Sequence, residues 1–376
     1  MQAAHLGRPN CFEIDLDAIG RCVSRIREYI GPDIRFFATL KANAYGYGLI
    51  PVARTVLARG ADALSLVSMD DAVRLREAGF KVPILVYAGN VPDEATVRAA
   101  ESYDLIPTVH NETSLAVFAR HARRKIAVAV KVEVGPERIG VPAEHAAQFV
   151  KAVSQHPLLK VQVLNSHPSV TPHGRREECL AWQYERFVAA CKDLERLGID
   201  VPLKVAACSN VLRIAGRSMV MNAVDPGDAL FSPLDKSKPD SALQPFHALK
   251  SRLIEVRDVT RSTFIEEAPF RIVPGMRIGV IPIGYSDGMR HLHCGEVLVR
   301  GMRAKILTAP ALEYTRIDLT AIPHAQVGDE EAIIGRQGDA VITPEAVAKR
   351  QNAARVADLA LEVRHTIPKR YIGGPQ

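Results

Sequence analysis

The stretch Ile34-Arg35-Phe36-Phe37-Ala38-Thr39-Leu40-Lys41-Ala42-Asn43-Ala44-Tyr45-Gly46-Tyr47-Gly48 places a lysine directly after a short apolar run. The run predicts a buried strand, and the glycines after Tyr45 are typical of a tight turn. From such a turn the hydroxyl group of Tyr45 could reach a phosphate. A lysine enclosed at the end of a strand loses its proton more easily than one on a surface, as nucleophilic amines must. Taken alone, the pattern fits a surface lysine beside a glycine turn equally well.

Similar apolar runs recur along residues 34 to 230, and helical stretches separate them. We expect strands at Ile34–Thr39, Ala63–Val67, Pro83–Ala88, Leu105–Val109, Ile126–Val134, Lys160–Asn165, Leu203–Ala207 and Asn222–Val224. The helices have recognisable ends: Asp70–Ala78 follows Ser68, another opens at Pro92-Asp93-Glu94, and Trp182–Leu197 has apolar residues at helical spacing. This alternation predicts a (β/α)8 TIM-type barrel. A doubly wound open sheet is the competing topology.

The alternation of strands and helices ends at about His247, and a chain of 376 residues is long enough for a second domain. Strands are expected there at Lys250–Val256, Arg277–Pro282, Glu296–Arg300, Arg303–Leu307 and Ala332–Ile334, with few helices. We therefore predict a barrel domain over 12–240 and a mainly β C-terminal domain over 241–376. Residues 1–15, with a strand at Phe12–Ile14, should pack with the second domain, and Lys236-Ser237-Lys238-Pro239-Asp240 should link the two.

The composition is that of a globular protein with a mild positive charge. The net charge is +6, but basic residues are scattered among acids and the densest run, Arg123-Arg124-Lys125, is short, which argues against nucleic-acid binding. A positive protein would still attract an anionic cofactor or substrate. We expect a cytoplasmic protein, because no apolar stretch could span a membrane and the start lacks a secretion signal. Six cysteines without a C-x-x-C pair argue against disulfides and a metal site, and most of them should be small core residues: Cys11, Cys22, Cys179, Cys191, Cys208 and Cys294.

Several motifs follow one another in a recognisable order. Besides residues 39–48 they are K-V-E-V-G-P-E-R-I-G at 131–140, N-S-H at 165–167, D-P-G-D-A-L at 225–230, I-P-I-G-Y-S-D-G at 281–288 and E-Y-T-R-I-D-L-T at 313–320. Together they resemble the alanine racemase family of fold-type III enzymes, which use pyridoxal 5′-phosphate (PLP), and the resemblance covers nearly the whole chain. It implies a PLP-dependent amino-acid racemase or epimerase that forms a homodimer with shared active sites.

The resemblance assigns roles residue by residue. Lys41 would form the Schiff base with PLP and act as the base on one face of the substrate Cα, while Tyr285 would serve the opposite face across the dimer interface, as stereoinversion requires. Arg138 matches an arginine that contacts the cofactor's phenolic oxygen and the substrate carboxylate. Lys131 matches a lysine that is often carbamylated and orients that arginine, and His167 a histidine linked to the tyrosine. Further residues implied are Tyr45, Ser209, Asn210, Asp225 and Gly227 for the cofactor, and Leu312 and Glu313 for the substrate.

Several of these residues could also have a purely structural role. Without the resemblance Tyr285 would be a buried tyrosine, and Arg138 would be an arginine at a helix start. Lys131 could point to solvent on an alternating strand. His167 would be structural, and Asp225 could be a capping or surface acid.

The departures from the family pattern concern the electronics and the substrate pocket. Asp225 stands where the family has an arginine against the pyridine nitrogen, and a carboxylate there would stabilise a protonated ring and a delocalised carbanion. Ala206 replaces a supporting histidine, and Ala357 falls at a phosphate-binding tyrosine. Leu312-Glu313 stands where the family has Met-Asp beside the substrate.

Three functions are therefore open. The first is an amino-acid racemase or epimerase, whose substrate need not be alanine; Tyr285 and Arg138 favour it. The second is a PLP-dependent lyase, decarboxylase or α-substitution enzyme, which Asp225 favours because a stronger electron sink assists the breaking of any Cα bond. The third is a non-catalytic PLP-binding protein, against which the second domain argues.

Overall fold

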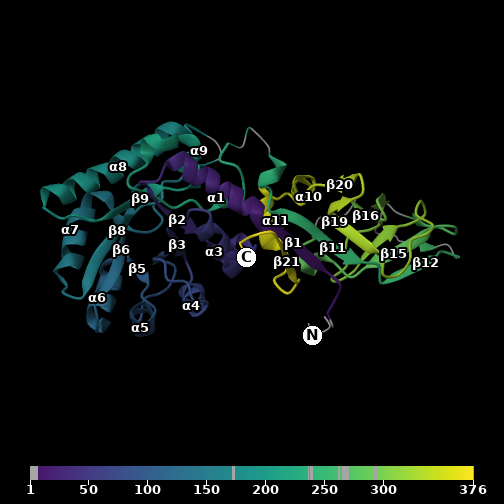
Figure 1. The fold of residues 1–376 in the computed structure, drawn as a ribbon, viewed down its shortest axis with the longest axis horizontal. Helices are drawn as coiled ribbons and strands as arrows, with labels where there is room; N and C mark the ends of the chain where they lie inside the picture. Colours follow the sequence, from purple (N-terminus) through teal and green to yellow (C-terminus); the bar gives the residue numbers. More distant parts are fainter. Residues whose placement is uncertain are drawn as a thin grey trace. The chain divides into compact units, whose positions relative to one another are not determined.

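The computed structural model describes residues 7–171, 174–235, 237, 240–260, 263–264, 271–290 and 295–375 (Figure 1). The chain forms two compact units. The barrel unit comprises Ala18–Ala44 and Gly48–Leu243; the C-terminal unit comprises the chain up to Asp17, Tyr45–Tyr47 and Gln244–Gly374. Of the expected linker, residues 236, 238 and 239 lie outside the described residues, as does Cys294.

The barrel unit is a closed ring of parallel strands. These are β2 (Arg35–Thr39), β3 (Ala63–Leu66), β4 (Ile84–Val86), β5 (Ile106–Val109), β6 (Ile126–Glu133), β8 (Leu159–Asn165), β9 (Leu203–Ala207) and β10 (Ala223–Val224). They pair in this order, and β10 pairs with β2 to close the ring, while β7 (Val141–Pro142) pairs with β6 at its side. The barrel prediction is therefore confirmed and the open sheet excluded. All eight expected strands are present, with ends that differ by at most two residues.

Helices surround this ring in Figure 1. They are α1 (Leu16–Ile30), α3 (Leu49–Ala58), α4 (Met69–Glu77), α5 (Glu94–Ser102), α6 (Glu112–His121), α7 (Ala143–Gln155), α8 (Arg176–Arg196) and α9 (Ser209–Ile214). The unit also has the short left-handed segment α2 (Lys41–Tyr45) and the 3₁₀ turns η1 (Gly216–Met219), η2 (Asp228–Leu230) and η3 (Ser241–Leu243). Ser68 and Asp93 cap α4 and α5, as their sequences predict. The helix expected at Trp182–Leu197 begins earlier, at Arg176, because its first turn is polar and carries two acids that favour a helix N-terminus.

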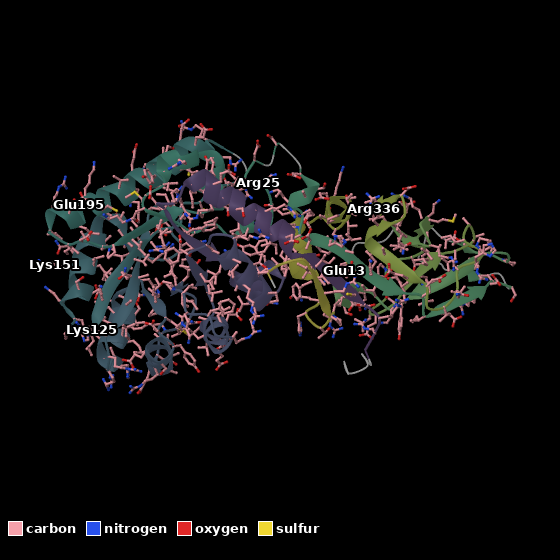
Figure 2. All side chains as sticks on the ribbon, in the orientation of Figure 1. Glu13, Arg25, Lys125, Lys151, Glu195 and Arg336 are labelled. Atoms are coloured by element: carbon pink, nitrogen blue, oxygen red, sulfur yellow. The ribbon has the colours of Figure 1, made fainter. Side chains whose placement is uncertain are left out.

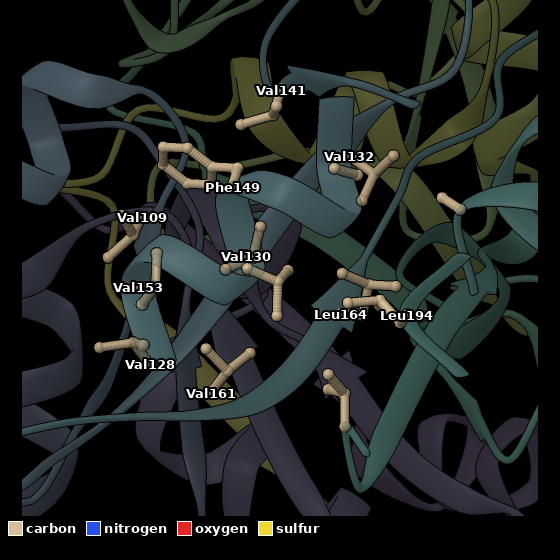
Figure 3. Close-up of a cluster of buried hydrophobic side chains, with 14 of the residues drawn as sticks. Val109, Val128, Val130, Val132, Val141, Phe149, Val153, Val161, Leu164 and Leu194 are labelled. Carbon is tan, nitrogen blue, oxygen red and sulfur yellow. The ribbon is translucent and has the colours of Figure 1, made fainter. Parts of the chain in front are cut away.

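Two apolar layers hold the barrel together. Outward-facing residues such as Val128, Val130 and Val132 of β6 pack with Val150 and Val153 of α7 (Figure 3). The second layer fills the interior with one residue from each strand: Phe37, Ala63, Leu85, Ile106, Ala129, Val163, Val205 and Ala223. The barrel is consequently a packed core rather than a pore.

The C-terminal unit is mainly β, as expected. Its strands are β1 (Cys11–Asp15), β11 (Phe246–Arg252), β12 (Glu255–Asp258), β13 (Thr263–Phe264), β14 (Arg271–Ile272), β15 (Arg277–Ile281), β16 (Glu296–Val299), β17 (Met302–Lys305), β18 (Thr315–Asp318), β19 (Glu330–Gln337), β20 (Ala340–Ile342) and β21 (Lys369–Ile372). The main sheet has the order β17-β16-β19-β11-β1-β21, and β12-β15-β18 form a smaller sheet. The unit also contains helices α10 (Pro344–Arg350) and α11 (Val356–Glu362) and the 3₁₀ turn η4 (Tyr285–Asp287).

The strand expected at Phe12–Ile14 lies within β1, which pairs with β11 and β21. The single strand expected at Lys250–Val256 is wrong, because β11 ends at Arg252 and β12 begins at Glu255 in a different sheet. At this break Leu253 is buried whereas the adjacent Ile254 is 42% exposed, so the two apolar residues between the strands do not reveal the change of sheet.

The surface carries charges of both signs, and Lys125, Lys151 and Glu195 point outward around the barrel unit in Figure 2. Within the described residues, no helix has the length and apolar character needed to cross a membrane. Cys22, Cys191 and Cys208 are buried thiols, while Cys179 is exposed and Cys11 half-buried. The prediction of core thiols is thus correct for three of the five described cysteines.

Glu331 provides a test of the C-terminal core. It lies in β19 with a relative exposure of 0%, and neither carboxyl oxygen has a partner among the described residues. Burial, aided by the negative charge of Glu330, raises the pKa of Glu331 well above its ordinary value of 4.5. The folded protein therefore keeps a proton that the unfolded chain loses, so the stabilisation is complete below about pH 4.5 and declines as the pH rises toward the folded-state pKa.

We expect Glu331→Gln to raise the melting temperature at pH 8 and to have little effect near pH 4. Relative to the variant, the wild type should lose up to about 1.4 kcal/mol per pH unit within that window. Thermal unfolding followed by circular dichroism at several pH values measures the difference, and Glu255→Gln, an exposed glutamate of the same unit, is the control. Parallel curves for wild type and Glu331→Gln would show that Glu331 is not a buried neutral acid.

Candidate active site

A polar layer lies directly beyond the apolar interior of the barrel. Because strand side chains alternate between faces, residues two positions after the apolar layer also point inward. They are Thr39, Ser65, Tyr87, Thr108, Lys131, Asn165, Ala207 and Asp225, and seven of these eight are polar. They mark the C-terminal ends of the strands, the end at which barrel enzymes carry out their chemistry.

Asp225, directly after β10, is the buried acid of this layer. Its relative exposure is only 5%, so it is neither a surface acid nor a capping residue. Its Oδ2 accepts a hydrogen bond from the Tyr87 hydroxyl at 2.6 Å and a longer one from Asn165 Nδ2 at 3.4 Å. Its Oδ1 is buried and has no hydrogen-bond partner in the described part of the chain. One half of the carboxylate is therefore held and the other half unsatisfied.

The charge state of Asp225 results from opposing influences. Burial raises the pKa of Asp225 to about 6, while the hydrogen bond from Tyr87 and then the positive charges of Lys131 and Lys41 oppose the rise. The carboxylate is consequently mostly ionised at pH 7.

Lys131 points into the barrel rather than to solvent. Its relative exposure is 7%, and its Nζ donates to Asn165 Oδ1 at 2.8 Å and lies 6.0 Å from the centroid of the Tyr87 ring. Burial lowers the pKa of Lys131 to about 8, with the negative charge of Asp225 opposing the shift. Asn165 thus bridges the buried cation and the buried anion with its two amide atoms.

Lys41 begins α2, immediately after β2. Leu40 N donates to the Ser65 carbonyl at 2.9 Å, which fixes the end of the strand. The next four residues, 42–45, all have φ between 53° and 55°, a left-handed turn that is costly for residues other than glycine and is found mostly at functional sites. Asn43 Oδ1 caps the turn by accepting from Leu49 N at 2.8 Å. Contrary to our expectation of an enclosed lysine, the Lys41 side chain is exposed in the single chain.

Arg138 lies in the loop after β6 and not at a helix start. The Glu133 carboxylate organises this loop by accepting hydrogen bonds from four backbone N–H groups, including that of Arg138 at 3.1 Å. Lys131, Arg138 and His167 line one hollow at this end of the barrel. Burial, together with the positive charges of Lys131, Arg138 and Lys41, lowers the pKa of His167 to about 3, so its imidazole is neutral at physiological pH.

Ser209 holds the loop that follows Asp225. Its buried Oγ accepts hydrogen bonds from the backbone N–H groups of Gly227 and Ala229, both at 3.0 Å, and among the described residues its own proton has no acceptor. Asn210 beside it is exposed. An ion pair between Arg213 and Asp228 anchors the same loop.

Tyr285 opens the turn η4 in the C-terminal unit. Asp287 in this turn is fully buried, accepts from Gly284 N at 3.0 Å and receives both terminal nitrogens of Arg8 at 2.9 and 2.7 Å. Gly284 leaves no room for a side chain, because a Cβ would lie 2.3 Å from the Ala311 carbonyl oxygen. The backbone that carries Tyr285 is therefore rigid.

The side chains beside this turn are largely exposed. Tyr285 is 44% exposed, so it is not an ordinary buried tyrosine, and Leu312 and Tyr314 are 54% and 51% exposed. Glu313 lies 3.6 Å from Arg364 and 3.9 Å from Arg8.

Two other predicted positions lie in the C-terminal unit. Tyr45 is buried, and the following Gly46 approaches α11 so closely that a Cβ would lie 2.4 Å from the Ala360 carbonyl oxygen. Ala357 is buried in α11 and supplies no hydroxyl.

The structure thus divides the predicted residues into two sets. The barrel set, Lys41, Lys131, Arg138, His167 and Asp225, is linked by electrostatic interactions. Ser209, Asn210 and Gly227 also lie in the barrel unit, whereas Tyr45, Tyr285, Leu312 and Glu313 belong to the C-terminal unit. Neither Tyr87 nor Asn165 was predicted to have a role, although Asn165 stands in the N-S-H motif. Counting two residues beyond the apolar interior layer would have found both.

The fold and the barrel set define a TIM-barrel enzyme with amines and a buried acid at the C-terminal mouth and a mainly β C-terminal domain. Residues 14–234 match the family model described as "Alanine racemase, N-terminal domain", and residues 246–371 match "Alanine racemase, C-terminal domain". The chain belongs to the alanine racemase family.

Known relatives agree with this over nearly full length. An alanine racemase from Halothermothrix orenii is 31% identical, with 98% of each chain covered, and alanine racemase 1 from Bacillus subtilis is 31% identical over 96% of this chain and 92% of its own. The crystal structure of the alanine racemase from Bacillus anthracis with bound L-Ala-P superposes with a TM-score of 0.86 at 28% identity, covering 98% of this chain and 96% of that one.

Proposed function

We propose that this protein is a PLP-dependent amino-acid racemase or epimerase, an isomerase that moves a proton at Cα. The observation that carries the proposal is the position of Lys41, which directly follows β2 and lies within electrostatic reach of the buried Asp225. Membership in the alanine racemase family over nearly the whole chain supports the same reaction.

The described residues fit PLP. The unpartnered, buried Oδ1 of Asp225 is an acceptor for a protonated ring nitrogen. Lys41 supplies a primary amine for the aldehyde, and Ser209 has a hydroxyl proton to donate to the phosphate. Tyr45, Asn210 and Gly227 complete the proposed cofactor contacts. When bound, PLP withdraws electrons from the substrate and so acidifies the Cα proton.

Two bases then account for inversion at Cα. Lys41 removes or returns the proton on one face, and Tyr285 of the partner subunit does so on the other. Arg138 binds the substrate carboxylate, since a guanidinium matches a carboxylate with two parallel hydrogen bonds. His167, held neutral, orients the tyrosine hydroxyl. Lys131, whose Nζ donates to Asn165 Oδ1, acts in this proposal as an unmodified cation beside Arg138. The carbamate that the family resemblance implies for this position would be anionic, so it is an alternative state of Lys131.

We further propose a homodimer with shared sites. Tyr285, Leu312 and Tyr314 form an exposed, largely apolar surface, and burying such a surface against a second subunit would be favourable. Leu312 and Glu313 would meet the substrate side chain, whose identity need not be that of alanine.

The reaction is tested by incubating the protein and PLP with single L-amino acids in D2O. We expect deuterium at Cα together with formation of the D enantiomer for at least one substrate. Chiral chromatography and mass spectrometry measure both. Release of CO2 or an aldehyde without the D enantiomer would contradict a racemase and indicate a lyase.

Lys41→Ala should abolish covalent attachment of the cofactor, because the other amine of the barrel set, Lys131, is buried and donates to Asn165. Borohydride reduction followed by peptide mass spectrometry locates the trapped adduct. Lys131→Met, which removes the other amine of the site, should keep the adduct on Lys41. An adduct on a different lysine in the wild type would refute this assignment.

Tyr285→Phe should impair proton transfer on one face of Cα by about 10²- to 10⁴-fold and affect the other face much less. Solvent deuterium exchange, measured separately from the L and the D substrate without inversion, reports the two faces. Tyr314→Phe, another exposed tyrosine of the same unit, is the control. Equal losses from both enantiomers would indicate a structural role for Tyr285, and normal racemisation would exclude it as a base.

A further inference from the structure

The hydrogen bonds around Asp225 divide its carboxylate into two unlike halves. Oδ2 is occupied by the Tyr87 hydroxyl at 2.6 Å and the Asn165 amide at 3.4 Å. Oδ1 is equally sealed from water but has no donor among the described residues. A buried charged oxygen without a donor is costly, so its persistence in a well-packed barrel points to a ligand that supplies one.

We propose that Tyr87, assisted by Asn165, is a positioning residue that holds Asp225 with Oδ1 presented to the ring nitrogen of PLP. The inference rests on the proposed function and adds to it the residues that determine which oxygen of Asp225 faces the cofactor.

Tyr87 can act only as a donor toward Asp225. Burial first, and then the adjacent Asp225 charge, raises the pKa of Tyr87 well above its ordinary value, so the phenol stays protonated. Its short hydrogen bond stabilises the ionised carboxylate and fixes its rotation about the Cβ–Cγ bond. Thr39 holds the backbone of the same residue by donating to the Asp225 carbonyl at 2.9 Å. Both the side chain and the main chain of Asp225 are therefore fixed.

Lys131 supplies charge without competing for Oδ1. Its Nζ donates to Asn165 Oδ1 at 2.8 Å, and Asn165 turns its amide nitrogen toward Asp225. The cation thus favours the ionised form of Asp225 from a distance, while the oxygen that the cofactor needs stays available. An arrangement in which Lys131 bound Asp225 directly would leave a ring N–H without its acceptor.

The test compares the affinity of the cofactor-free protein for PLP with that for the carbocyclic analogue, in which C–H replaces the ring nitrogen. Both compounds have the aldehyde and the phosphate, so the ratio of their dissociation constants isolates the ring-nitrogen contact. The variants are Tyr87→Phe, Asn165→Ala and Asp225→Asn. Tyr184→Phe is the matched control, because this tyrosine of the barrel unit donates to Met221 Sδ at 3.2 Å and not to Asp225.

We expect the wild type and Tyr184→Phe to prefer PLP by roughly 10- to 100-fold, the range of a charge-assisted hydrogen bond. Asp225→Asn should remove most of this preference, Tyr87→Phe should reduce it about tenfold, and Asn165→Ala should reduce it less. Circular dichroism confirms that each variant is folded. If Tyr87→Phe does not fold, Asn165→Ala decides by the same ratio.

Two failures are distinguishable. If neither compound attaches to Lys41 of the wild type, the proposed function itself is wrong. If both attach, but the preference in folded Tyr87→Phe and Asn165→Ala equals that of the wild type, the function stands and the positioning role is overturned.

Discussion

Asp225 holds a carboxylate in the interior of the barrel, where water does not reach it, and the neighbouring side chains have to compensate for that charge. Tyr87 and Asn165 donate to one oxygen, and Lys131 contributes a positive charge through Asn165. The members of this network depend on one another, because removing one partner leaves a buried polar group unsatisfied. A ligand that donates a hydrogen bond to the unsatisfied Oδ1 would therefore gain binding free energy at this atom.

The regular alternation of side chains along the barrel strands produces this arrangement. Eight strands each contribute one apolar residue to the interior, and two residues further along each contributes to the polar layer. Because strand side chains alternate with a period of two, the same strands that fill the interior with apolar residues also bring Lys131, Asn165 and Asp225 together in the polar layer at their C-terminal ends. Lys41 lies two residues after Thr39 of the polar layer, and the left-handed turn that follows it places its amine at the C-terminal end of the barrel.

The sequence predicts the barrel well, because each strand is a short apolar run with clear boundaries, as at Ala63–Leu66 and Leu203–Ala207. The position of Lys41 follows from the end of β2. The partners of Asp225 could not be paired in advance, since Tyr87 and Asn165 lie on strands far apart in the chain and the register around the ring decides which side chains meet. The exposure of Lys41 was also missed, because a strand pattern does not show how far a following turn protrudes.

By the family resemblance, an arginine would be expected at the position of Asp225. An arginine cannot accept a proton from a ring nitrogen, whereas an ionised carboxylate can hold one in place. The proposed site therefore combines the two proton-transfer residues of a racemase, Lys41 and Tyr285, with a stronger electron sink. In this proposal the ring nitrogen is protonated and hydrogen-bonded to Asp225.

The most direct measurement is the ¹⁵N NMR shift of PLP labelled at the ring nitrogen and bound to the protein, compared between wild type and Asp225→Asn at neutral pH. The account predicts the shift of a protonated pyridine nitrogen in the wild type, moving toward that of the unprotonated ring in the variant. An unprotonated ring nitrogen in the wild type would contradict it.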